Sequence, residues 1–268
     1  MSQKRQPAFL DPKAKRWALI TTLVYDYRPG HVVPWHFHDW GQFVYASSGV
    51  MTVRTREGTW IVPAQRAVWI PAGTAHQIKM SGRVCMRTLY VKPRLTSRLP
   101  RHCAVVHVSP LLRELVLHAC QTPSLSNRRP AQSHLIDTIL DQLKVAESIA
   151  LQLPEPADPR SMRVARIIID DPSDQRTLEH LCAGVGGCKR TIERLFRTET
   201  RMTFGRWRQQ LRLMHGLRSL AEGNKITQVA LDSGYSTTSA FISMFRKALG
   251  TTPSRYFSNI PATHSRNT

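Results

Sequence analysis

Short runs of β-branched and aromatic residues fill the chain between residues 17 and 92. They span residues 17–27, 42–45, 50–55, 59–62, 67–70 and 84–91. Glycine, often beside proline or serine, interrupts them at residues 29–30, 48–49, 57–58, 71–73 and 81–82. Short strands separated by turn residues at this spacing predict an antiparallel β sandwich or a small β barrel.

From residue 109 the hydrophobic pattern changes to the period of an α-helix. Apolar residues recur at spacings of three and four in two stretches, which are Leu111, Leu112, Leu115 and Val116, then Leu135, Ile139 and Leu143. Amphipathic helices are therefore expected to follow the strands. The second stripe is either a seam between two copies of the chain or a face packed against the barrel, and the pattern fits both equally.

Residues 153–159 contain three prolines in seven residues. Prolines remove backbone donors and stiffen the chain, which is typical of a linker between domains. The sequence therefore predicts an α+β protein in several parts. These are a sensor barrel over residues 1–108, a helical segment for dimerisation or packing over 109–152, the linker over 153–159, an all-α domain over 160–258, and a tail over 259–268.

Beyond the linker the pattern predicts helices over residues 160–170, 177–184, 188–198, 204–221, 226–233 and 237–248, with a last turn from Pro253. Two pairs of short helices recur about 50 residues apart. In each pair apolar residues share one face, and a glycine, Gly186 or Gly234, stands at the turn. This pattern predicts two helix-turn-helix motifs. An ordinary helical bundle with solvated basic residues is the alternative, and it leaves the repetition unexplained.

The outward positions of the second helix in each pair are the candidates for contact with a DNA major groove. They are mostly charged in the first motif and mostly small or hydroxylated in the second. They comprise Lys189, Arg190, Glu193, Arg194 and Arg197, then Thr237, Thr238, Ala240, Ser243 and Arg246. The helix expected between the motifs is about 27 Å long at the usual rise per residue. That length suits two recognition helices held about one DNA turn, about 34 Å, apart.

The net charge supports a polyanionic partner. Lys and Arg number 38 against 18 Asp and Glu, a formal charge of +20. Such a charge favours nucleic acid first and anionic lipid second. Residues 1–159 hold 20 basic and 10 acidic residues, and residues 160–258 hold 17 and 8. Charge alone therefore does not say which part of the chain binds nucleic acid.

The five cysteines include no CxxC pair, so a disulfide framework and a thiolate zinc site are not expected. The N-terminal residues are charged where a secretory signal needs an apolar core, and no run of 18 apolar residues occurs. The chain is therefore expected to be cytoplasmic, with no membrane partner.

Residues in both motifs, and in the helix between them, carry a family resemblance. They are Thr177-Leu178, Arg190-Thr191-Ile192, Arg194-Leu195-Phe196, Phe204, the stretch 208–213, Val229-Ala230, Gly234-Tyr235-Ser236, Phe241, Phe245-Arg246 and residues 250–253. With them, residues 160–258 resemble the DNA-binding domain of the AraC/XylS family of transcriptional regulators. The sequence departs from the family at Cys188, where a helix-capping serine is usual, and at Ser243, where a basic residue is frequent.

The resemblance implies a DNA-binding unit of two helix-turn-helix motifs joined by a linker helix. It implies double-stranded promoter DNA and a small-molecule effector as partners, with RNA polymerase as a further candidate and a homodimer as the expected assembly. Activation is common in the family, although the sequence fits an activator or a repressor. Control of a neighbouring transporter gene is a further expectation from the same resemblance.

The strands contain a second set of spaced residues. Gly30, His36, His38, Gln42 and Gly49 stand at the spacing G-x5-H-x-H-x3-Q-x6-G, and Pro71, Gly73 and His76 follow as P-x-G-x2-H. Residues of about 20–92 thereby resemble a cupin, which implies a jelly-roll-like β barrel. Gln42 stands where metal-binding cupins have glutamate. Two histidines two residues apart on a strand face the same side, so His36 and His38 are expected to point into the barrel with His76.

Three imidazoles and a carboxamide predict one of two roles for this site. His36, His38 and His76 either hold a divalent transition metal such as Zn²⁺, Ni²⁺ or Fe²⁺, or line an effector pocket together with Gln42. Because Gln42 replaces the usual glutamate, the site lacks a carboxylate, and its expected affinity for a metal ion is lower. Four tryptophans near these strands either make stacking walls for an aromatic ligand or belong to the core or an interface. They are Trp35, Trp40, Trp60 and Trp69.

The sequence therefore predicts a transcriptional regulator, not an enzyme, in which the barrel senses an effector and the helical domain binds promoter DNA. The alternative is a cupin-type metalloenzyme, a dioxygenase or isomerase with a helical domain. That class needs the glutamate absent at Gln42, and it leaves the paired motifs unexplained. A structural nucleoid protein is a third class, and it would not need a pocket.

Overall fold

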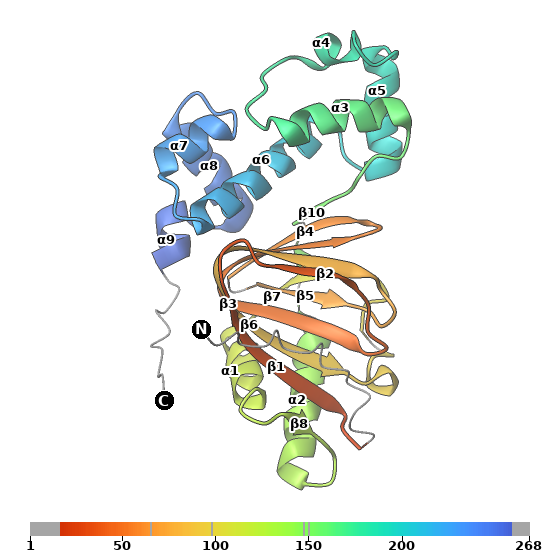
Figure 1. Ribbon diagram of the computed structural model, residues 1–268, viewed down its shortest axis with the longest axis vertical. Helices are drawn as coiled ribbons and strands as arrows, with labels where there is room; N and C mark the ends of the chain where they lie inside the picture. The colour runs from red at the N-terminus through yellow and green to blue at the C-terminus, as the bar shows by residue number, and fades with distance from the viewer. Residues whose placement is uncertain (1–16, 65, 98, 147, 150, 259–268) are drawn as a thin grey trace, which may run out of the picture.

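The computed structural model describes residues 17–258 except residues 65, 98, 147 and 150 (Figure 1). An antiparallel sheet with two helices on one face forms the first part of the chain, and helices alone form the second. The predicted α+β architecture is confirmed. The predicted tail, residues 259–268, lies outside the described residues.

The strands form a single antiparallel network of ten within the described residues. They are β1 (Ile20–Tyr27), β2 (Val32–His36), β3 (Gly41–Thr55), β4 (Gly58–Pro63), β5 (Arg66–Ile70), β6 (His76–Val91), β7 (Ala104–His107), β8 (Ser124–Leu125), β9 (Ser148–Ile149) and β10 (Gln152–Leu153). Strands β3 and β6 are long and pair with each other along most of their length.

The sequence predicted separate strands on either side of residues 48–49 and a strand that begins after residues 81–82, and both boundaries are wrong. Strands β3 and β6 each run through the glycine, with irregular register between Ala46 and Val50. Gly49 and Gly82 have φ of +79° and +69°, which glycine adopts without steric cost. The glycines therefore bend two continuous strands instead of ending them. On one side of the bends, β6 pairs with β1 and β3 pairs with β5, which in turn pairs with β7. On the other side, β6 pairs with β2 and β3 pairs with β4.

Alternation along the strands separates two hydrophobic cores. Val44 and Ile70 face the inner core, whereas their neighbours Phe43 and Trp69 face an outer core. Helices α1 (Pro110–Ala119) and α2 (Pro130–Val145) cover this outer core. Ile139 and Leu143 of α2 are buried in it, and Leu135 packs at its margin. The predicted apolar stripe therefore packs on the sheet.

After α2 the chain returns to the sheet before it enters the helical part. Strand β9 pairs with β7, and β10 pairs with β4 through Gln152 and Leu153. The hydrophobic pattern did not predict these two-residue strands, because they are too short to show a period. The indole of Trp207 then donates a 2.8 Å hydrogen bond to the carbonyl of Pro154. The start of the proline-rich segment is thereby attached both to the sheet and to the helical part.

The helices of the second part begin and end close to the predicted positions. They are α3 (Pro159–Asp170), α4 (Leu178–Cys182), α5 (Lys189–Leu195), α6 (Phe204–Ala221), α7 (Ile226–Asp232), α8 (Thr238–Leu249) and α9 (Pro253–Ser258). No helix in the described part of the chain is long and apolar enough to cross a membrane.

Helix α5 is shorter than expected, because residues 196–200 form a π turn. The Thr198 and Thr200 hydroxyls donate to main-chain carbonyls in this turn and compete with the regular helix. The carboxylate of Glu199 accepts hydrogen bonds from the main-chain N–H groups of Ala157 and Asp158, at 2.9 and 3.3 Å. The π turn therefore joins the first helix-turn-helix to the end of the linker.

Helix α6 packs against β3, β6 and β10. The bend of β6 approaches so closely that a Cβ on Gly82 would overlap the carbonyl oxygen of Ala221. Near the end of the chain, the buried Tyr256 hydroxyl donates a 3.0 Å hydrogen bond to the carbonyl of Ala64, and burial raises the pKa of Tyr256 to about 12. One hydrophobic cluster runs from the barrel interior into the helices. The two parts therefore share a core.

Gly82→Ala tests this contact, and Gly30→Ala is a matched control. Both glycines have positive φ, at +69° and +75°, so both substitutions carry a backbone cost of about 1–2 kcal/mol. Only the methyl group added at residue 82 meets a helix, α6, because nothing lies within 4 Å of a Cβ at Gly30. We expect Gly82→Ala to lower the free energy of unfolding by at least about 1 kcal/mol more than Gly30→Ala. Chemical denaturation measures this, and equal losses would contradict the contact.

Candidate functional site

Helices α4 and α5 form the first helix-turn-helix. The Thr177 hydroxyl caps α4 by accepting the N–H of His180 at 3.4 Å. Gly186 makes the turn at φ +69°. The inward residues are buried, as the periodicity predicts, and they comprise Leu178, Leu181, Cys182, Ile192, Leu195 and Phe196. The motif is therefore an angled pair of short helices around an apolar seam.

The opposite face of α5 and of the following turn presents positive charge. Lys189, Arg190, Arg194 and Arg197 are exposed, and Glu193 is half-buried. The Lys189 ammonium lies 2.6 Å from a carboxylate oxygen of Glu179 on α4, and Arg197 Nε lies 3.7 Å from Glu193. Solvent-exposed pairs of this kind contribute little stability. The side chains can therefore exchange these partners for phosphate.

The cap of α5 differs from that of α4. Cys188 occupies the N-cap position and makes no side-chain hydrogen bond to the helix backbone. Its sulfur lies 3.2 Å from the Thr191 hydroxyl instead. The cap of α5 is therefore weaker than that of α4.

Helices α7 and α8 form the second helix-turn-helix. Gly234 makes the turn at φ +75°, and Val229, Ala230, Phe241 and Phe245 are fully buried. Thr237, Ala240, Ser243 and Arg246 are exposed, and Thr238 is half-buried. The Thr237 hydroxyl accepts the N–H of Ala240 at 3.2 Å. This hydroxyl therefore already holds the start of α8, which the sequence pattern did not reveal.

Helix α6 fixes the two motifs relative to each other. A Cβ on Gly216 would overlap the ring of Phe241, so α6 and α8 are in close contact. The Arg212 guanidinium donates to the carbonyls of Pro172 and Asp174 at 3.0 and 2.8 Å, and its group fills the space beside Gly234. Arg212 is therefore a structural residue, although it lies in a basic domain.

The three predicted histidines come together in the barrel. His36 at the end of β2 pairs with His76 at the start of β6, and His38 follows β2 directly. The ring centroids of His36 and His76 are 4.2 Å apart, and those of His36 and His38 are 4.8 Å apart. One ligand nitrogen from each ring lies within 4.8 Å of the others. Their predicted convergence is confirmed, except that His38 lies beyond the strand.

Hydrogen bonds fix the tautomer of two of these rings. Nδ1 of His36 lies 2.7 Å from the carbonyl of Pro34, and Nδ1 of His76 lies 2.8 Å from that of Thr74. A carbonyl only accepts, so Nδ1 carries the proton and Nε2 keeps its lone pair. Burial lowers the pKa of His36, and it lowers the pKa of His76 to about 3. Both rings are therefore neutral near pH 7, which is the form that binds a metal.

Among the residues that the structure describes, Nε2 of His76 and Oε1 of Gln42 are buried at this site and find no hydrogen-bond partner. Buried polar atoms are seldom left in this state. The Gln42 amide donates to the Tyr90 hydroxyl at 3.3 Å, and the Tyr90 ring lies 4.9 Å from that of His38. Tyr90 is thus a site residue that no sequence motif indicated. Nitrogen donors without a carboxylate fit Zn²⁺ or a similar borderline ion.

Two known families match the chain. The AraC-like ligand binding domain matches residues 20–155, and a helix-turn-helix domain matches residues 181–259. The first match covers the sheet with α1 and α2, and the second covers the two predicted motifs from residue 181 on.

Individual known proteins also resemble the chain. The HTH-type transcriptional regulator NimR of Escherichia coli is 32% identical over 227 residues, which cover 85% of this chain and 83% of NimR. The HTH-type transcriptional regulator RipA of Corynebacterium glutamicum is 33% identical over 103 residues, or 38% of this chain and 31% of RipA. Among solved structures, ToxT from Vibrio cholerae is 12% identical and covers 89% of this chain and 98% of ToxT, with a TM-score of 0.38.

The histidine site predicts a measurable affinity for zinc. We expect chelator-treated protein to bind about one Zn²⁺ per chain. His76→Ala should weaken binding at least about tenfold, because it removes a donor. Gln42→Glu should strengthen it by about tenfold, or about 1.4 kcal/mol, because it supplies an anionic ligand. Competition with a chromophoric chelator measures all three affinities.

His134→Ala is the matched control for this measurement. His134 is exposed on α2, away from the cluster, and its removal should leave zinc affinity unchanged. Equal losses in His76→Ala and His134→Ala, or no binding to any variant, would rule out the metal site.

Proposed function

The chain belongs to the AraC family of transcriptional regulators, and on that premise we propose that α5 and α8 bind promoter DNA in successive major grooves. The observation that carries this proposal is the pair of helix-turn-helix motifs joined by α6. Helix α6 has 18 residues, about 27 Å at 1.5 Å per residue. Its two ends hold the motifs at a separation close to one DNA turn.

The exposed side chains of the two helices give them different modes of recognition. Lys189, Arg190, Arg194 and Arg197 supply four cations for phosphates and guanine edges. Helix α8 presents Thr238, Ala240 and Ser243, whose methyl and hydroxyl groups suit thymine methyls and mixed base edges. Arg246 adds a cation beside them. The Glu193 carboxylate accepts a hydrogen bond from the amino group of a cytosine, or it orients Arg197 through their ion pair.

The barrel acts as the sensor in this proposal. His36, His38 and His76 form its site with Gln42, and the ligand is either a divalent metal ion or an organic effector held by the same polar atoms. The unpartnered Nε2 of His76 and Oε1 of Gln42 support both versions. A bound metal ion would supply a positive charge at the start of β6, whereas the surrounding residues orient the imidazoles. Strand β6 then leads from His76 to the contact with α6.

The remaining expectations follow from the family. We propose a cytoplasmic homodimer that meets RNA polymerase at the promoter, with a neighbouring transporter gene as the candidate target. The metalloenzyme alternative leaves both helix-turn-helix motifs without a role, so the regulator is the function that explains the whole chain.

Footprinting of the full chain on the DNA beside its own gene tests the proposal. We expect protection of two successive major grooves on one face of the duplex. Alanine substitutions in α5 and the turn that follows it should then divide into two classes. Loss of a phosphate contact weakens binding to all DNA sequences and lowers the slope of log affinity against log salt concentration by about one. Loss of a base contact costs about 1–3 kcal/mol of binding free energy on the specific site only.

Arg129→Ala is the control for these substitutions. Arg129 is exposed at the start of α2, in the sensor part of the chain, and its loss should leave DNA affinity nearly unchanged. The proposal fails if no groove is protected. If Arg190→Ala and Arg194→Ala match Arg129→Ala, α5 is not a recognition helix.

A further inference from the structure

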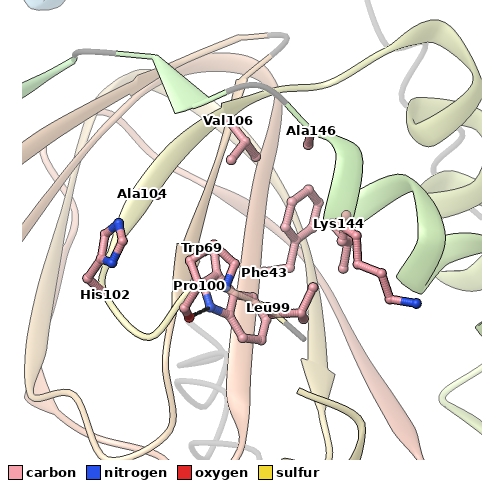
Figure 2. A pocket seen from close by; sticks show the side chains of 10 residues that line it. Phe43, Trp69, Leu99, Pro100, His102, Ala104, Val106, Lys144 and Ala146 are labelled. Atoms are coloured by element: carbon pink, nitrogen blue, oxygen red, sulfur yellow. Dashed lines mark hydrogen bonds between the residues drawn. The ribbon is translucent and has the colours of Figure 1, made fainter. Parts of the chain in front are cut away.

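The outer core contains a cavity that belongs to neither the histidine site nor the DNA interface. It lies between the outer face of the sheet and the end of α2, and its volume is about 80 Å³. Figure 2 shows its walls, which come from β3, β5, β7, the loop before β7, and α2. Phe43, Trp69, Leu99, Ala104, Val106 and Leu143 supply most of the surface.

Two aromatic rings form the rigid part of this wall. Phe43 and Trp69 are neighbours on paired strands, and both are almost fully buried. The Trp69 indole N–H donates to the carbonyl of Pro100 at 2.8 Å, and the ring packs so closely on Gly41 that a Cβ there would overlap it. Trp69 is therefore held in one orientation, and its N–H is already used. It offers the cavity an apolar surface.

The polar groups at the rim indicate the charge of a suitable ligand. The Lys144 ammonium lies 2.7 Å from a carboxylate oxygen of Asp141, and in Figure 2 it points away from Trp69. Only the alkyl part of Lys144 therefore lines the cavity. The exposed His102 stands at the opposite rim. Its imidazole can donate or accept one hydrogen bond.

We propose that this cavity binds a small neutral molecule with one aromatic ring and one hydrogen-bonding group. An enclosed cavity of about 150 Å³ holds benzene. This cavity is smaller, but it opens to solvent between the exposed His102 and Lys144, so a ring enters it edge first and contacts the apolar walls. Aromatic rings pack favourably against Phe43 and Trp69 in offset or edge-to-face geometry. Of the lining residues, only His102 and Lys144 carry a titratable group, and the Lys144 ammonium points away from the cavity, so the site discriminates against carboxylates.

The cavity and the Gln42 side chain of the histidine site lie on opposite faces of β3. Phe43 faces the cavity, and its neighbour Gln42 faces the barrel interior on the same strand. Their partners on β5 alternate in the same way, because Phe43 pairs with Trp69 and Gln42 pairs with Ile70. A ligand beneath α2 therefore contacts the strand pair that carries Gln42. The proposal goes beyond the DNA-binding function and does not depend on it.

Phenol is a suitable probe, because it is neutral at pH 7 and has one ring and one hydroxyl group. With the full chain, we expect phenol to raise Tm by a few degrees at saturation and to shift the indole N–H resonance of Trp69, assigned with Trp69→Phe. Benzoate, which has a charged carboxylate, should do neither. No shift of the Trp69 resonance, or an equal response to benzoate, would overturn the proposal.

Ala146→Phe and Ala131→Phe provide a matched pair of variants. Ala146 lines the cavity just after α2, whereas Ala131 is exposed near the start of the same helix. Filling the cavity with Ala146→Phe should weaken phenol binding at least about tenfold, while Ala131→Phe should leave it unchanged. Equal phenol affinity in the two variants would contradict the site. If Ala146→Phe does not fold, the Trp69 resonance of the wild-type chain decides the question.

Discussion

The packing of helix α6 is the constraint on which the rest of the structure depends. This helix lies between the two helix-turn-helix motifs and also packs on the bent strands β3 and β6. Gly216 lets α8 approach one side of it, and Gly82 lets the barrel approach its end. Trp207, near its start, holds the proline-rich segment through Pro154. A single rigid element therefore sets both the spacing of the recognition helices and their position relative to the barrel.

This arrangement gives the sensor a direct mechanical connection to the DNA interface. Strand β6 begins at His76 in the histidine site and reaches the contact with α6 at Gly82, six residues later. Tyr256 makes a second connection from the end of the helical domain to the barrel. Coupling between sites needs an element that both ligands affect. Strand β6 and helix α6 together provide one, since the same hydrophobic cluster contains both.

The sequence predicted those features that depend on local chemistry. Apolar periodicity and turn glycines located the helices, because Gly186 and Gly234 act on their immediate neighbours. The histidines converged because His36 and His76 stand opposite each other on paired strands. Long-range packing was not predictable. The bends at Gly49 and Gly82, the strand that includes Leu153, the anchoring of Arg212 and the cavity beside Trp69 all depend on segments distant in the sequence.

Amide hydrogen exchange of the full chain, with and without its target promoter, tests the central claim most directly. The claim is that α6 couples the DNA interface to the barrel. Promoter binding is therefore predicted to change the exchange of residues 76–83 in β6, although the proposed DNA contacts lie only in the helical domain. Coupling of this kind is worth about 1–3 kcal/mol in typical cases, which corresponds to a change of about 5–150-fold. Protection confined to residues 160–258, with β6 unchanged, would contradict the account.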